Sequence, residues 1–326
     1  MKIPGRAFWF TKLALGLAVI AWLVSRTDLE SLWSTLRSIE LLWLIPVLLL
    51  PHLGILLSSM KWHALLRARG AHASQGMLFR LYMIGTFFSS FLPSMVGGDV
   101  VRVYQLSRAG CDSSVVVAST FLERFVGLAA LITLLPLAAM QPQVSQALPG
   151  LWQFIALAAV GVAILSVVLF TGRAASAGAV YENAPGLVAR LQRILRRSRQ
   201  QVQSYRGHTG SLAYGYVLSL VFYLSAGVTV WCATRAVGGT PDLLVIVSVT
   251  PLVLMLGLIP ISINGLGILE AGYTWLLMSL GMTLSEALAV ALVLRFRSLL
   301  TAGLGGMLFL AYRGVVPQPV VATHHA

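Results

Sequence analysis

Residues 92–99 read Leu-Pro-Ser-Met-Val-Gly-Gly-Asp, and residues 259–270 read Ile-Pro-Ile-Ser-Ile-Asn-Gly-Leu-Gly-Ile-Leu-Glu. In both stretches an apolar run is interrupted by proline and glycine and then meets an acidic residue. The acid of each stretch precedes an Arg-Phe pair by 25 residues, and these pairs begin at Arg124 and Arg295. Charges inside hydrocarbon are costly and usually mark polar pathways. The sequence therefore indicates a repeated design, similar to the broken helices of membrane transporters.

The composition around these two stretches is that of a membrane protein. The chain is 58% hydrophobic and 10% charged, whereas soluble domains are about 25% charged. Apolar windows long enough to cross a bilayer recur along it. The predicted spans cover 8–24, 41–58, 77–92, 113–139, 151–171, 211–234, 243–259 and 285–312, with a further apolar stretch at 268–281. We expect an all-α integral membrane protein of about eight hydrophobic helices, folded as a single domain over residues 1–326.

The net charge of +13 is distributed in a way that favours membrane orientation over nucleic-acid binding. If all eight spans crossed fully, the N-terminal basic cluster and the arginine-rich loop 172–210 would lie on opposite sides, against the positive-inside rule. If segments 77–110 and 243–282 instead dip in and return, most cations become cytoplasmic, including Lys12 and Lys61. Three would then lie outside, namely Arg26, Arg37 and Arg235.

This second arrangement is the one we expect, with six full crossings and two re-entrant hairpins that form an inverted repeat. Both termini and the basic loop 172–210 are then cytoplasmic. The core of repeat one covers 77–139, and the core of repeat two covers 243–312. The alternative is that the Pro-Gly breaks only kink ordinary transmembrane helices.

Non-helical backbone at membrane depth is tolerated only where it is buried in protein or lines a wet cavity, so we expect both breaks to face one polar cleft. The half-helices after the breaks would aim unpaired N–H groups into it. The backbone positions expected to form the breaks are Pro93, Gly97, Gly98, Pro260, Gly265 and Gly267. The side chains expected to bind substrate are Asp99, Arg102, Glu123, Arg124, Asn264, Glu270, Arg295 and Arg297.

The arginines in this set outnumber the acids, and arginine binds phosphate through two parallel hydrogen bonds. The set therefore favours an anionic headgroup, with the acids tuning the site or carrying protons. Asp99 and Arg102, three positions apart on a helix, can form a pair. The alternative is that these residues are structural ion pairs that lock the hairpins to neighbouring helices.

The sequence has no nucleotide-binding, metalloprotease or serine hydrolase motif. We therefore expect neither an enzyme nor a metal or other cofactor. An intramembrane transferase that acts on a lipid carrier, with Asp99 or Glu270 as its base, stays open as a second possibility. A non-catalytic membrane subunit of a lipid or envelope biosynthesis complex is the third.

Four stretches resemble the integral membrane domain of lysylphosphatidylglycerol synthases. They are Phe-Phe-Ser-Ser-Phe-Leu-Pro at 87–93, Gly-Gly-Asp-Val-Val-Arg at 97–102, Glu-Arg-Phe-Val-Gly-Leu at 123–128, and Pro-x-Ser-x-x-Gly-Leu-Gly-x-x-Glu-Ala at 260–271. The resemblance covers nearly the whole chain. It departs at Leu269, where the family often has arginine, and this puts the headgroup preference in doubt.

This flippase-like family is linked to moving aminoacylated phospholipid between leaflets, whereas a separate soluble domain makes that lipid. Because the chain ends at Ala326 without such a domain, the resemblance implies a stand-alone translocase and not a synthase. We expect a multi-pass protein of the prokaryotic cytoplasmic (inner) membrane that moves polar or anionic lipid headgroups through a midplane cleft. Its expected partners are membrane lipids and, as a further possibility, lipid-biosynthesis enzymes, but not nucleic acid.

Overall fold

A computed structural model describes residues 5–92, 97–171, 198, 200–259 and 261–312, and these residues contain helices and no strand. The helices of the first half are α1 (Gly5–Ser25), α2 (Leu29–Arg37), α3 (Leu41–Arg67), α4 (Gln75–Phe91), α5 (Gly97–Arg108), α6 (Ser113–Ala139), α7 (Pro142–Ala147) and α8 (Leu151–Thr171). The second half contains η2 (Tyr205–Gly207), α10 (Thr209–Ala236), α11 (Leu243–Leu256), η3 (Ile263–Gly265), α12 (Ile268–Ser279) and α13 (Leu284–Ala311). The prediction of an all-α fold is confirmed.

Helix starts follow local sequence signals. The Asp28 carboxylate accepts hydrogen bonds from the first turn of α2, and Asp112 does the same for α6. Thr283 and Glu286 cap α13 reciprocally, since each side chain accepts a hydrogen bond from the other's backbone N–H. These caps satisfy amides that a helix cannot pair internally, so the polar connections fix where the apolar helices begin.

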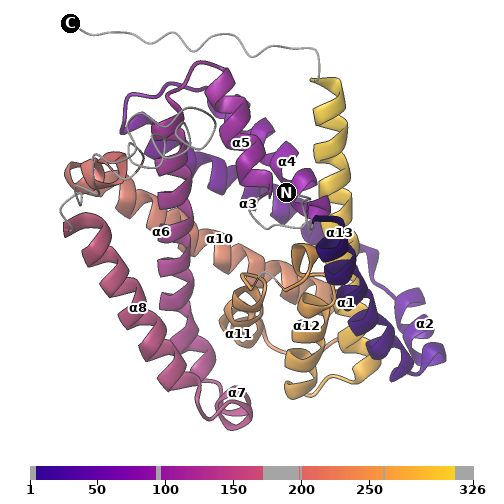
Figure 1. Cartoon of the computed structure of the whole chain (residues 1–326). Coiled ribbons are helices and arrows are strands. Elements are labelled where there is room, and N and C mark those ends of the chain that lie inside the picture. Colours follow the sequence, from indigo (N-terminus) through magenta and orange to yellow (C-terminus); the bar gives the residue numbers. More distant parts are fainter. Residues whose placement is uncertain (1–4, 93–96, 172–197, 199, 260, 313–326) are drawn as a thin grey trace, which may run out of the picture.

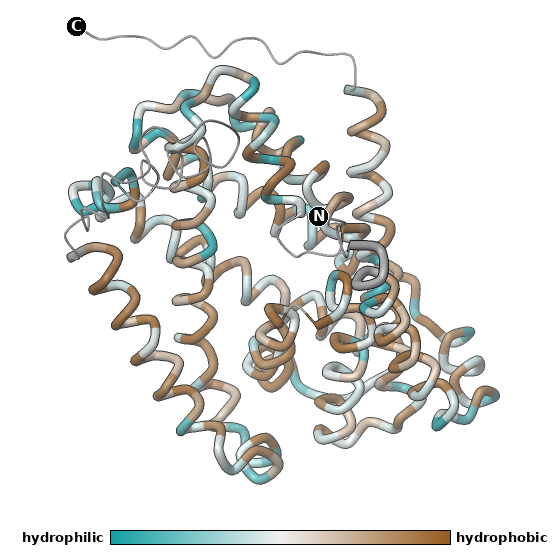
Figure 2. The backbone as a smooth tube through the Cα atoms, in the orientation of Figure 1, coloured by the Kyte–Doolittle hydropathy of each residue, from teal (hydrophilic) through white to brown (hydrophobic). Residues whose placement is uncertain are grey.

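Five of the described helices are long and apolar enough to cross a membrane: α3, α6, α8, α10 and α13. A sixth candidate forms if α1 and α2, bent by 95° at their junction, are counted together. The full count of eight hydrophobic helices is not established by this criterion, because α4 and α11 are only 17 and 14 residues long. Figure 2 shows the long helices as mainly hydrophobic, with hydrophilic residues concentrated in the connections between helices.

The two predicted breaks both fold the chain back on itself. In the first, Gly98 of α5 packs so closely on Gly85 of α4 that a Cβ at Gly98 would overlap the Gly85 carbonyl oxygen. In the second, a Cβ on Gly272 of α12 would lie 3.1 Å from side-chain atoms of Val253 and Leu256 in α11. Each pair of helices therefore folds back on itself as a hairpin.

The hairpins are positioned by the helices that follow them. Figure 1 shows α6 descending from the α5 side of the molecule, whereas α13 ascends on the opposite flank, so the two run in opposite directions. α13 also packs on α4, where Gly305 and Gly306 leave room for Met83 and Phe87. The largest buried apolar cluster joins α6, α10, α11, α12 and α13 and includes Leu135, Ile246, Leu276 and Leu288.

Several predicted features fall outside the described residues. These are Pro93, Pro260 and most of the basic loop 172–210, of which the structure describes 198 and 200–210. In the described part of that loop, the Tyr205 hydroxyl donates a hydrogen bond to the Leu65 carbonyl at 2.7 Å. The C-terminal end of this loop is thus packed against α3.

Candidate functional site

The first charged cluster is built around the α4–α5 hairpin. Close packing at Gly98 brings the first turns of α5 against α4, and α6 covers the open side. Asp99 and Arg102, one turn apart on α5, are both buried, with 8% and 1% of their surface exposed. They form an ion pair, as the spacing predicted.

Arg124 of α6 holds Asp99 from the other side. Its Nε and Nη2 atoms donate to the two carboxylate oxygens of Asp99, each at 2.9 Å. This two-pronged arrangement is the strong geometry for an arginine-carboxylate pair. Asp99 therefore joins the hairpin to α6 and accepts hydrogen bonds from two arginines at once.

The rest of the cluster is buried beneath this pair. Arg102 also donates to Glu123 at 3.3 Å, and its guanidinium lies 3.8 Å from the ring centre of Tyr82 and 4.9 Å from that of Trp62. Such stacking satisfies the faces of a desolvated guanidinium. Arg102 is thus enclosed by two acids and two aromatic rings, a surrounding that suits a structural residue of the cluster.

Lys61 of α3 completes the buried part of the cluster. It was expected in a cytoplasmic loop, because the apolar window ends at residue 58, but it lies inside α3, which continues to Arg67. Lys61 is 7% exposed; its Nζ lies 3.7 Å from Glu123 and donates to Ser219 of α10 at 3.0 Å. Lys12, also assigned to the cytoplasm, is likewise buried at 7% exposure.

Exposure separates Arg124 from the rest of the cluster. Its side chain is 55% exposed, whereas those of Arg102 and Glu123 are 2% and 6% exposed. Glu123 and Arg124 are adjacent, so they point to different sides of α6. Glu123 points into the buried part of the cluster, and Arg124 points outward. The cluster of Lys61, Asp99, Arg102, Glu123 and Arg124 carries three positive and two negative charges. Its accessible member is a cation.

The second cluster lies at the α11–α12 hairpin. Arg295 of α13 forms an ion pair with Glu270, including a 3.0 Å bond from Nη2, and its Nη1 donates to the Asn264 carbonyl at 3.4 Å. The side chains of Glu270 and Arg295 are 2% and 12% exposed. As in the first cluster, an arginine 25 residues after the acid fixes the hairpin to the following helix.

The backbone of the second break is unusual. Asn264, Gly265 and Gly267 have φ angles of 48°, 68° and 80°, a region that glycine adopts without strain and that asparagine tolerates better than most residues. The Gly267 N–H donates to Glu270 at 2.7 Å, so this acid also caps α12. One N–H group at the start of α12, that of Gly267, is therefore already paired with an acid of its own helix.

The two breaks meet at one point. The Asn264 side-chain amide donates to the Ser90 hydroxyl, near the end of α4, at 3.2 Å. No ion pair among the described residues joins the first cluster to the second. Within the described residues, the charged side chains thus form two clusters, and the bond from Asn264 to Ser90 connects the second break to α4.

Arg297 forms no ion pair with a described residue of either cluster. Its Nε donates a 3.4 Å hydrogen bond to the Leu294 carbonyl of its own helix. Gly97 packs closely against the Leu92 side chain. Four residues around the first cluster could not be predicted, because nothing in the spacing of their three separate helices, α3, α4 and α10, indicates that they converge: Lys61, Trp62, Tyr82 and Ser219.

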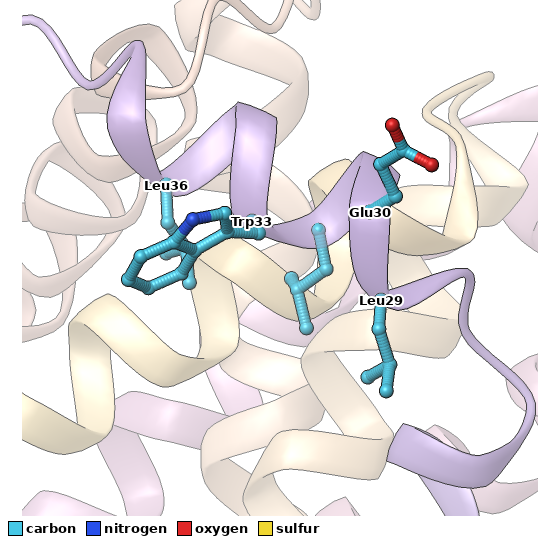
Figure 3. Close-up of a pocket in the computed structure, with 5 residues that line it drawn as sticks. Leu29, Glu30, Trp33 and Leu36 are labelled. Carbon is cyan, nitrogen blue, oxygen red and sulfur yellow. The ribbon is translucent and has the colours of Figure 1, made fainter.

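Two further features do not belong to the site. A hollow of about 440 Å³ lies along α2, and Figure 3 shows the residues that line it: Leu29, Glu30, Leu32, Trp33 and Leu36. None of the residues of the two clusters contributes to it. Within the described part of the chain, no group of three or more His, Cys, Asp and Glu residues is arranged to hold a metal ion.

Comparison with known proteins agrees with the resemblance seen in the motifs. The family described as "Lysylphosphatidylglycerol synthase TM region" matches residues 9–306 of 326. No curated protein and no solved structure gives a match. The match includes both hairpins, both charged clusters and the helices that hold them. The chain therefore belongs to the lysylphosphatidylglycerol synthase transmembrane-region family.

Proposed function

We propose that this protein translocates lipids with anionic or polar headgroups between the leaflets of a prokaryotic cytoplasmic membrane. The observation that carries the proposal is the position of Arg124. It is the twelfth residue of the 27-residue helix α6, close to the middle of a membrane span, and its side chain is 55% exposed. A half-exposed guanidinium at that depth is too costly to face hydrocarbon, so it faces water or a bound headgroup.

The electrostatics of the first cluster support an anionic ligand. The cluster has one more cation than acids, and Arg124 is the cation with free surface. A phosphate that approaches Arg124 can take the place of Asp99 on one or both donors, while Asp99 keeps its bond to Arg102. Because Asp99 stays paired, this exchange leaves no charged group without a partner.

The arrangement of the hairpins supports movement across the bilayer. The two Asp/Glu–Arg pairs occupy equivalent positions in the repeats, and α6 and α13 run in opposite directions (Figure 1). In the proposal, the hairpins are re-entrant and enter from opposite sides, as an inverted repeat. Headgroups are handed from one hairpin to the other while the acyl chains stay in lipid, a scheme typical of alternating-access carriers.

An intramembrane transferase is the second candidate, and the geometry favours it less. A general base needs a carboxylate that is free to take a proton from its substrate. Asp99, Glu123 and Glu270 each accept hydrogen bonds from arginine instead. These contacts suit binding and positioning. A non-catalytic subunit of a lipid-biosynthesis complex would need none of the cluster's exposed charge.

The proposal is tested by reconstituting the full chain into vesicles with fluorescently labelled phosphatidylglycerol. We expect inner-leaflet label to be lost faster with the wild type than in protein-free vesicles. With Arg124→Gln, the rate of this loss should be at least tenfold lower than with the wild type. Arg108→Gln, which removes the same charge from an exposed site at the end of α5, should match the wild type. Mass spectrometry of recovered lipid should show no covalent change. A folded wild type no faster than protein-free vesicles refutes the proposal, and a covalently altered lipid favours the transferase.

A further inference from the structure

Arg297 occupies the deepest position that a residue of α13 can have. It is the fourteenth of 28 residues, so about 20 Å of helix separates it from either end at 1.5 Å per residue. Its side chain is too short to reach the membrane surface from there by snorkelling. It is partly buried rather than enclosed, so it has both protein and accessible space around it.

Within the described residues, Arg297 lacks the carboxylate partner that the other embedded arginines have. Arg102 and Arg124 share Asp99, and Arg295 holds Glu270. No carboxylate of the described residues pairs with Arg297, and the hydrogen bond that its side chain donates to a described residue, the Leu294 carbonyl, uses one of five N–H donors. An uncompensated cation at mid-span is expensive, which indicates that its counter-charge comes from a ligand.

The surroundings of Arg297 fit a phosphate. Tyr273 of α12, whose hydroxyl can donate a hydrogen bond, lies within electrostatic range of Arg297, as does Arg295. Arg295 is already neutralised by Glu270, so the local charge from Glu270, Arg295 and Arg297 is +1. A guanidinium edge with a nearby hydroxyl donor is suited to two neighbouring oxygens of a phosphate.

We infer that Arg297, assisted by Tyr273, forms a second anion site, separate from the one at Arg124, that binds a phosphate group. None of the residues in electrostatic range of Arg124 belongs to the Arg297 group; they are Lys61, Tyr82, Asp99, Arg102, Glu123 and Tyr223. The chemistry is shared by a lipid phosphodiester and free inorganic phosphate. That the lipid is the source rests on the proposed function, with one phosphate site in each repeat.

The test measures binding and not transport. Delipidated full chain in detergent is titrated separately with short-chain phosphatidylglycerol and with inorganic phosphate, and bound molecules are counted by native mass spectrometry. We expect two phosphatidylglycerol sites in the wild type and one in Arg297→Gln, with that site's affinity reduced at least tenfold. Arg124→Gln should lose the other site, the double variant should lose both, and Arg108→Gln should keep both.

Stability provides the second readout. If Arg297 is an unpaired cation awaiting a ligand, Arg297→Gln in the delipidated state unfolds at the same temperature as the wild type or higher. A clear loss of stability would show a structural partner and overturn the inference, as would two unchanged sites in Arg297→Gln. If inorganic phosphate binds and phosphatidylglycerol does not, the anion site is supported, but its phosphate does not come from a lipid. Two sites without any translocation leave this inference standing and remove the proposed function.

Discussion

The Glu270–Arg295 pair allows a quantitative test of what holds the second hairpin against α13. Both side chains are largely buried, at 2% and 12% exposure. Glu270→Gln removes the negative charge but keeps an oxygen that can accept the Gly267 N–H, so the cap of α12 survives. The substitution therefore isolates one effect, which is a buried arginine left without its acid.

Removing one partner of a buried ion pair costs about 3–5 kcal/mol, because the remaining charge is uncompensated. We expect Glu270→Gln to lower the free energy of unfolding by about that amount, since little solvent screens the pair. In the double variant Glu270→Gln/Arg295→Met the stranded charge is gone, and replacing a buried pair by neutral groups is often close to neutral. We expect the double variant to regain most of the loss and to lie within about 1–2 kcal/mol of the wild type.

The assay is equilibrium unfolding in mixed micelles with increasing sodium dodecyl sulfate, followed by the fluorescence of the eight tryptophans. Recovery in the double variant is the critical result. If the single and double variants are equally destabilised, the stranded charge is not the cause. If Glu270→Gln costs less than about 1 kcal/mol, the pair does not behave as the buried pair described in the structure.

Two further substitutions test the packing around the hairpins. Gly305→Ala should destabilise the protein by about 1–3 kcal/mol, because a Cβ there overlaps the Met83 carbonyl of α4; Gly303→Ala, with open space around it, should not. Equal melting temperatures for the two variants would contradict this. Asn264→Ala should be less stable than Asn264→Gly in thermal melts, because both lose the bond to Ser90 but only alanine is strained at a φ of 48°. The reverse order would exclude backbone strain at this break.

The spans could be predicted from the sequence because long apolar runs have no other stable environment. The observed bounds of α6, 113–139, equal the predicted ones, and those of α13, 284–311, differ by one residue. Errors arose where a helix continues past its apolar window. α3 runs nine residues beyond 58, and that extension carries Lys61 into the first cluster.

The candidate site could be predicted only in part. The equal spacing from Asp99 to Arg124 and from Glu270 to Arg295 indicated that the two repeats are equivalent, and both pairs form. Pairing of this kind was open to a structural or a functional interpretation. The exposed fraction of each side chain now distinguishes the arginines from one another. Arg102 and Arg295 are enclosed by partners, whereas Arg124 is not, and spacing alone cannot show such a difference.

The convergence of helices distant in sequence also could not be predicted. Lys61 and Ser219 are 158 residues apart and hydrogen-bonded, and Asn264 reaches Ser90 across 174 residues. These contacts depend on how whole helices pack. A periodic pattern in one segment carries information about the face that is buried, but not about the segment that covers it.

The central claim is that Arg124 lies in a hydrated crevice at mid-span, and cysteine accessibility in the bilayer tests it most directly. Cys111 and Cys232 are first replaced by serine. Arg124→Cys is then compared with Val160→Cys on α8, also near the middle of a span and 53% exposed. In vesicles, a charged, membrane-impermeant thiol reagent should modify residue 124 and spare residue 160, although both react in denaturant. If both stay unmodified in the bilayer, Arg124 faces lipid, and the account is contradicted.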